Sequence, residues 1–167
     1  MKPYIFTLLA LFLSAATIQA QENKEHTHNE HLSTLINEYL AAKDALTVDN
    51  FGEAQNHISN FTKEVKSNNE MNEHKEHQKK HEAHHSKMLA AVEKASSANN
   101  IEELRNSLEG ITEELLEAIE NQGYDKSVLY VQFCPMANDG KGAKWMSDKE
   151  EIRNPYFGKK MHKCGAT

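Results

Sequence analysis

The residues best suited to chemistry gather between Tyr130 and Gly165 of this 167-residue chain. Both cysteines lie there, with the single tryptophan and half of the six methionines. Thiolate, thioether and imidazole groups are soft or borderline ligands that select Cu(I) over hard ions. One prediction is therefore a soft metal site. Its candidate ligands are Cys134, Met136, Met161 and Cys164, with His162 and Met146 as further donors and Trp145 as a shield or cation–π partner.

The same two cysteines allow a second interpretation. Two cysteines in an exported protein form a disulfide by default. A Cys134–Cys164 bond would close a loop of about 30 residues and stabilise the fold by about 3–4 kcal/mol in the chain-entropy model. The methionines and Trp145 would then form the core of a cross-linked cap. The sequence leaves both interpretations open.

A second group of potential ligands lies in residues 72–85, where histidines occur among alternating glutamates and lysines. On a helix, residues four apart lie on one face, and a histidine pair at that spacing can hold a borderline divalent ion. The alternative is a solvated helix or loop whose histidines bind nothing. The weak Zn(II) or Ni(II) site predicted here would draw on His74, His77, His81, His84 and His85.

Apolar residues at steps of three and four predict four amphipathic helices in residues 31–126. Asp49 and Asn50 interrupt the pattern and can cap the following helix. Asn100 with Glu103 is a capping-box-like start, and Gly123 is a suitable stop. The short connections favour an antiparallel bundle. The predicted fold class is therefore all-α, an antiparallel four-helix bundle with an irregular C-terminal strap over residues 127–167.

The start of the chain is typical of a secretory signal. Lys2 precedes an uncharged, largely apolar run from Pro3 to Ala20, which ends on small residues. We expect residues 1–20 to be removed and residues 21–30 to form a disordered, histidine-bearing N-terminus. No later run is long and apolar enough to predict a membrane span once the signal is cleaved.

Several function classes are disfavoured. The formal net charge of −6 makes the chain a poor nucleic-acid binder. The sequence contains no Gly-x-Ser-x-Gly elbow and no Cys-x-x-Cys motif. We therefore predict that the protein is not an enzyme.

The tail carries several short motifs in a fixed order, and they resemble the bacterial family known as domain of unknown function 3347. Residues 130–165 resemble this family densely, whereas the helical part resembles it loosely, through a segment ending at Arg105. Three positions depart from the family pattern: Lys144, Met146 and His162 replace the usual residues. The motifs are Cys134-Pro-Met136-Ala, Trp145-Met-Ser, Ile152-Arg-Asn-Pro-Tyr-Phe-Gly158 and Met161-x-x-Cys164-Gly.

This resemblance implies a small exported protein, or a domain like those attached to periplasmic adaptor subunits of heavy-metal efflux pumps. It implies copper or silver handling without enzymatic activity. We therefore expect periplasmic binding of Cu(I) or Ag(I), as a chaperone, a buffer or an accessory to efflux. One alternative is a structural or interaction domain that docks on an efflux adaptor and contains a Cys134–Cys164 disulfide. Another is a histidine-rich Zn(II) or Ni(II) buffer.

Overall fold

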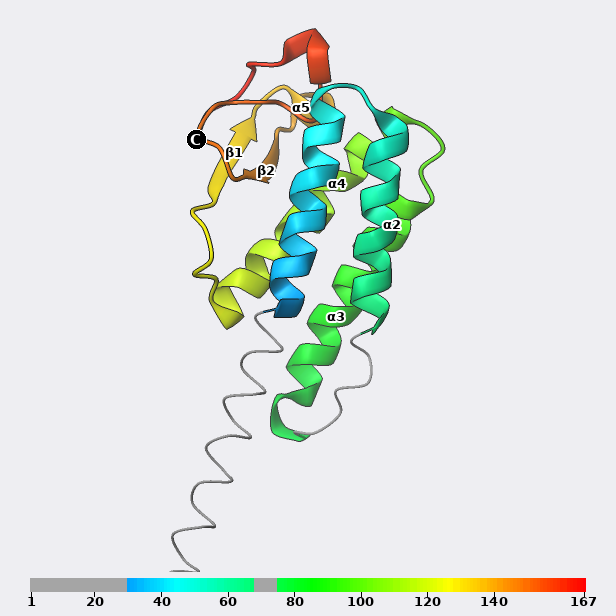
Figure 1. The fold of residues 1–167 in the computed structure, drawn as a ribbon, viewed down its shortest axis with the longest axis vertical. Helices are drawn as coiled ribbons and strands as arrows, with labels where there is room; N and C mark the ends of the chain where they lie inside the picture. The colour runs from blue at the N-terminus through cyan, green and yellow to red at the C-terminus, as the bar shows by residue number, and fades with distance from the viewer. Residues whose placement is uncertain (1–29, 68–74) are drawn as a thin grey trace, which may run out of the picture.

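The computed structural model describes residues 30–67 and 75–167, and it describes side chains in these ranges except for residues 75–84. Four long helices dominate: the first helix (residues 30–47), α2 (Phe51–Ser67), α3 (Lys75–Ser96) and α4 (Ile101–Gln122). They lie side by side, and the chain after α4 rises along them and gathers towards their upper end (Figure 1). That remainder contains β1 (Tyr130–Cys134), the short α5 (Ala137–Gly140), β2 (Ala143–Ser147) and the 3-10 turn η2 (Gly158–Met161).

The four predicted helices are confirmed, but the prediction of an all-α protein with an irregular strap is wrong in one respect. The tail contains a two-stranded antiparallel sheet formed by β1 and β2. Along β1, the exposed Val131 and Phe133 alternate with the buried Gln132 and Cys134, which is the period of a strand. The predicted signal segment and the N-terminal segment up to residue 29 lie outside the described residues.

The predicted helix boundaries follow from local hydrogen bonds. The side chain of Asn50 accepts the backbone N–H of Glu53 at 3.2 Å, at the start of α2. Asn100 caps α4 in the same way and accepts the N–H of Glu103 at 3.0 Å. These bonds satisfy backbone donors that have no partner inside a helix. Gly123 ends α4 with a φ of 79°, as its position after the last apolar residue predicted.

The apolar stripes of the four helices meet in one core. Burying one large apolar side chain contributes about 1.5–3 kcal/mol to the stability of the fold, so the contacts in this core determine how the helices pack. None of the described helices is both long and apolar enough to cross a membrane. The fully buried members include Ile36, Tyr39, Leu46, Ala54, Ile58, Phe61, Val92, Leu104, Leu108, Ile111 and Leu115.

Side chains from the first helix and from the tail bind the outer edge of β2. In an antiparallel pair, alternate residues direct their backbone groups away from the partner strand. The N–H of Met146 donates to the hydroxyl of Tyr39 at 3.1 Å, and the hydroxyl of Tyr156 donates to the carbonyl of Lys144. These bonds satisfy two groups of this edge without a third strand, and they join the hairpin to the first helix and to the tail.

Candidate functional site

The structure brings the two cysteines of the chain into contact. Cys134 is the last residue of β1 and is fully buried, whereas Cys164 lies in the tail and is half-buried. Their Sγ atoms are 3.1 Å apart, and both thiols are free. Both sequence interpretations of this pair required such an approach between residues 30 positions apart.

Backbone pairing between the tail and β1 produces this contact. Ala166 and Phe133 exchange two hydrogen bonds, with N···O distances of 2.8 and 2.9 Å, on the edge of β1 that does not face β2. Antiparallel pairing in this register sets Gly165 opposite Cys134, so Cys164 lies one residue from that position. The N–H of Cys164 also donates to the carbonyl of Met161 at 3.1 Å, which closes a tight turn just before the pair.

Asn154 is the most extensively bonded residue of the tail. It is fully buried, and its Nδ2 donates to the carbonyl of Cys164 at 2.7 Å. Its Oδ1 accepts the N–H groups of Tyr156 at 2.8 Å and Phe157 at 3.2 Å, and its own N–H donates to the carbonyl of His162 at 2.8 Å. The sequence indicated only a turn at this position.

Trp145 lies on the same side of the hairpin as Cys134. It is a residue of β2 and is fully buried. A Cβ atom at Gly165 would lie 2.7 Å from Cη2 of the indole, so the tail can approach the ring only because this residue is glycine. Tyr156 packs edge-on against the indole, with ring centroids 6.1 Å apart. The indole therefore packs between Tyr156 and Gly165, the residue that follows Cys164.

The remaining sulfur and imidazole candidates are less closely associated with the pair. Met146 is buried, but strand alternation places it on the opposite face of β2 from Trp145. Met136 has an exposed fraction of 53%. Met161 and His162 are half-buried in the turn before Cys164, where their backbone carbonyls accept hydrogen bonds. The structure thus gathers the two thiols and places Met161 and His162 in the adjoining turn.

The histidine tract falls on and just before α3. Nε2 of His85 donates to the carbonyl of Val65 at 2.9 Å, so one of its ring nitrogens is engaged. Among the described residues, no three or more His, Cys, Asp or Glu side chains are grouped to hold a metal ion. His74 lies outside the described residues, and the side chains of His77, His81 and His84 are not described either.

The surroundings of Cys164 favour its protonated state when no metal is bound. The hydrogen bond with Cys134, together with burial, raises the pKa of the Cys164 thiol above its ordinary value. A thiol rather than a thiolate therefore occupies this position at neutral pH. Any ion that binds there must displace a proton, because the thiolate is the metal ligand.

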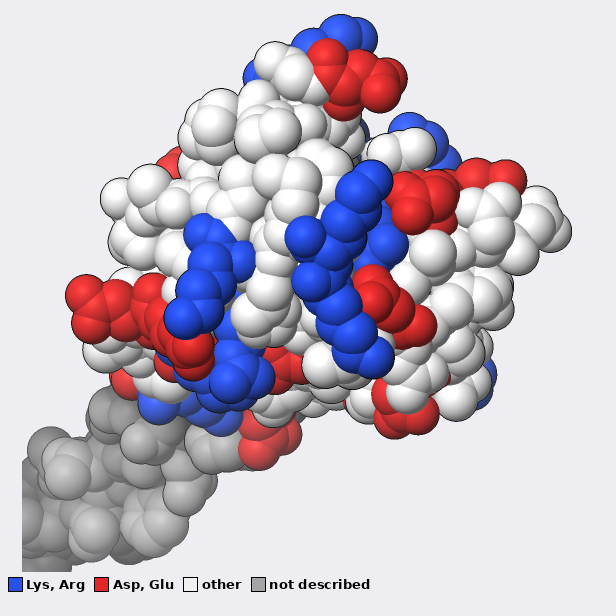
Figure 2. Space-filling view, turned by 90° about the horizontal axis from the view of Figure 1, so that it is seen from above, with Lys and Arg blue, Asp and Glu red and all other residues white. Residues whose placement is uncertain are grey.

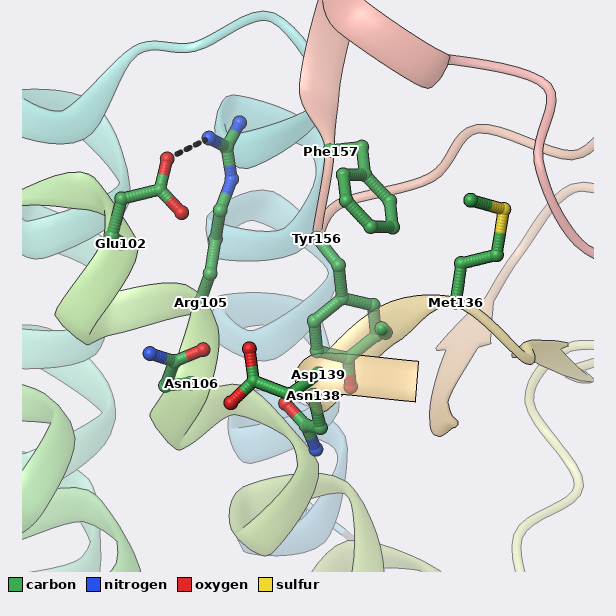
Figure 3. Close-up of a pocket in the computed structure, with 9 residues that line it drawn as sticks. Glu102, Arg105, Asn106, Met136, Asn138, Asp139, Tyr156 and Phe157 are labelled. Carbon is green, nitrogen blue, oxygen red and sulfur yellow. Dashed lines mark hydrogen bonds and ion pairs between the residues drawn. The ribbon is translucent and has the colours of Figure 1, made fainter. Parts of the chain in front are cut away.

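A cavity of about 160 Å³ lies between α4 and the tail. Figure 3 shows Arg105 and Met136 on opposite sides of it, with Tyr156 between them. The guanidinium of Arg105 is buried and donates to the carbonyl of Pro155 at 2.8 Å and to Asp49 at 2.6 Å. Arg105 therefore ties the tail to the helices, a role that no local pattern in the sequence indicated. The cavity is lined by Glu102, Arg105, Asn106, Met136, Ala137, Asn138, Asp139, Tyr156 and Phe157.

The surface at the end of the molecule where the tail lies carries charges of both signs. Figure 2 shows lysine and arginine side chains running across this end, with acidic side chains between them. Within the tail, Arg153 and Glu151 form an ion pair in which the Nε and Oε2 atoms are 3.3 Å apart. Exposed pairs of this kind contribute little to stability. The mixed pattern does not form a continuous basic patch on this face, which agrees with the overall acidic charge of the chain.

Comparison with known families gives one match. The sequence model of a family described as "Protein of unknown function (DUF3347)" matches residues 35–127. The matched segment runs from the first helix through α4 and ends before β1, so the thiol pair lies outside it. No curated protein and no solved structure matches this chain.

Proposed function

This chain belongs to the DUF3347 family, and we propose that it binds a soft monovalent metal ion, Cu(I) or Ag(I), through the thiolates of Cys134 and Cys164. The observation that carries the proposal is the contact between two free thiols, whose Sγ atoms are 3.1 Å apart. Thiolates select soft ions over hard ones. Two thiolates from separate segments of one chain are sufficient for the two-coordinate geometry that Cu(I) and Ag(I) accept.

Loading requires the two sulfur atoms to separate. Metal–sulfur bonds are about 2.3 Å long in zinc–thiolate sites, so an ion held between two sulfurs on opposite sides needs them about 4–4.6 Å apart. Cys134 is fixed within β1, but Cys164 is half-buried and follows a turn near the end of the chain. We therefore expect the movement to occur at Cys164. Binding should strengthen as pH rises, because each thiol must lose its proton.

The donor set favours a soft ion over Zn(II). Structural zinc sites take four protein ligands, usually cysteine and histidine. The described residues offer only the two thiols here, with Met161 and His162 in the adjoining turn. A thioether from Met161 is the natural third donor for Cu(I) and a poor one for Zn(II). The indole of Trp145 would exclude water from the bound ion on one side.

The scaffold and the setting form part of the same proposal. Short connections at residues 48–50 and 97–100 support an antiparallel four-helix bundle that carries the site at one end. The signal-like segment before Gln21 supports export to the periplasm. There the protein would act as a metal chaperone, as a buffer or as an accessory to efflux, with a periplasmic efflux adaptor as its partner. It would carry out no catalysis.

A second candidate function rests on the same distance of 3.1 Å between the two Sγ atoms. Free thiols in contact in an oxidising compartment readily become a disulfide, and Cys134 is fully buried. In that case the tail is a cross-linked cap and the protein is a structural or interaction domain. The two functions differ in what the cysteines do for the metal-free protein, because only a disulfide stabilises it.

Serine substitutions separate these two functions. If the thiolates bind the metal, Cys134→Ser and Cys164→Ser each abolish Cu(I) binding that resists a competing chelator, and the melting temperature of the metal-free protein changes little. Met146→Leu is the matched control, because Met146 lies on the other face of β2 and the substitution nearly conserves volume. It should leave copper binding unchanged.

The disulfide reading predicts the opposite result. Both serine variants should lose an equal 2–5 kcal/mol, roughly the cost of removing a native cross-link from a small secreted domain. Equal losses, combined with no chelator-resistant copper in the parent protein, would rule out the metal-binding proposal.

A further inference from the structure

We propose that Asn154 is the positioning residue of the thiol pair and that it holds the backbone at Cys164 where the Cys164 thiol meets Cys134. Asn154 does not touch either sulfur. It acts through the carbonyl of Cys164, which accepts the hydrogen bond from Nδ2 at 2.7 Å. The effect expected on Cu(I) binding rests on the proposed function, whereas the effect expected on thiol–disulfide exchange does not.

The hydrogen bonds around Asn154 fix the orientation of its amide. Oδ1 accepts two backbone N–H groups, those of Tyr156 and Phe157. Rotating the amide by half a turn would direct an NH2 group at these two donors and an oxygen at the carbonyl of Cys164, and all three contacts would become repulsive. The turn after Asn154 therefore determines the direction of Nδ2, and Nδ2 in turn holds Cys164.

The backbone of Asn154 strengthens this connection. Its N–H donates to the carbonyl of His162 at 2.8 Å, and its carbonyl accepts the N–H of Gly158 at 3.1 Å. One fully buried residue thus joins the turn that follows it to both ends of the His162–Cys164 segment. Because the carbonyl of Cys164 receives its hydrogen bond from Nδ2, the position of Cys164 depends on this side chain.

The closeness of the two thiols can be measured without any metal. Glutathione disulfide accepts two electrons and two protons from the Cys134 and Cys164 thiols, so that a protein disulfide and two molecules of reduced glutathione form. The equilibrium constant of this exchange rises as the folded protein holds the thiols closer together. A residue that positions Cys164 must therefore change this constant, whereas a residue that only stabilises the tail need not.

Asn154→Asp is the sharpest variant, because it keeps an acceptor for Tyr156 and Phe157 but replaces the donor to Cys164 with a carboxylate oxygen. We expect the exchange constant with glutathione to fall at least about tenfold, which corresponds to the loss of one partly buried hydrogen bond. Asn154→Ser is the second variant. It keeps a small acceptor but is too short to reach Cys164, and it carries the test should the aspartate variant fail to fold.

Tyr156→Phe is the matched control. It removes the hydrogen bond from the Tyr156 hydroxyl to Lys144 in the same tail but leaves the contacts of Asn154 intact. We expect all three variants to melt below the parent protein and only the Asn154 variants to change the exchange constant. An unchanged constant in the Asn154 variants, or an equal change in the control, would overturn the inference.

The metal readout distinguishes this inference from the proposed function. If both hold, the Asn154 variants also bind Cu(I) at least about tenfold more weakly in competition with a chelator, because the same carbonyl contact is lost. If the parent protein binds no Cu(I), the proposed function fails, but the glutathione equilibrium still measures the role of Asn154.

Discussion

Gly158→Ala should detach the tail from the helices. Gly158 has a φ of +54°, and a Cβ atom there would overlap with the carboxylate of Asp49 and the guanidinium of Arg105. These two groups form an ion pair at 2.6 Å, in which Arg105 is nearly buried. Both colliding atoms are at the ends of side chains, so the added methyl group can be accommodated only if the pair opens.

The expected cost has two parts. A left-handed backbone conformation costs a residue with a Cβ atom about 1–2 kcal/mol. Opening the ion pair leaves a buried guanidinium short of an acceptor, which costs about 1–3 kcal/mol. The sum of roughly 2–5 kcal/mol corresponds to a fall in melting temperature on the order of 5–15 °C for a domain of this size.

Thermal unfolding followed by circular dichroism tests this estimate. Gly52→Ala is the matched control, because a Cβ atom at Gly52 meets nothing within 4 Å and the residue lies in α2. That change should raise stability by about 0.5–1 kcal/mol. The reasoning is refuted if Gly158→Ala unfolds at the temperature of the parent protein, since the Arg105–Asp49 pair would then have no part in holding the tail.

Two further predictions concern the ends of the helices. The hydrogen bond from Arg105 lowers the pKa of Asp49, so this carboxylate stabilises the fold above its unfolded pKa and loses that contribution as the pH falls through its folded value. Asp49→Asn should therefore be less stable than the parent at neutral pH, and the difference should shrink in melts recorded below about pH 4. Asn100→Ala removes the cap that accepts the N–H of Glu103 and should cost about 1 kcal/mol in urea unfolding, whereas the exposed Asn106→Ala should be nearly neutral.

The helical part of the fold could be predicted because its signals are local. The apolar spacing and the caps at Asn50 and Asn100 lie within a few residues of the groups that they satisfy. The family was also predicted correctly, although the prediction relied on motifs of the tail and the family match lies on the helices. Both interpretations of the sequence placed Cys134 near Cys164, and the structure has them in contact. The sequence left open whether the pair binds a metal or forms a disulfide.

The tail could not be predicted in full because its contacts span long stretches of sequence. The strand at Tyr130–Cys134 pairs with residues 143–147, and this pairing depends on the fold. Asn154 resembles an ordinary turn residue, and its bond to Cys164 spans 10 positions. Arg105 and Pro155 are 50 positions apart, so only the folded chain reveals that they are joined.

The most direct test of the central claim counts thiols and metal in the same purified protein. Reduced protein is equilibrated with Cu(I) buffered by a chelator, its metal content is measured, and its thiols are titrated with a reagent for free thiols. The account predicts one copper ion per chain, with both Cys134 and Cys164 protected from the reagent. Two fully reactive thiols and no retained copper would contradict it.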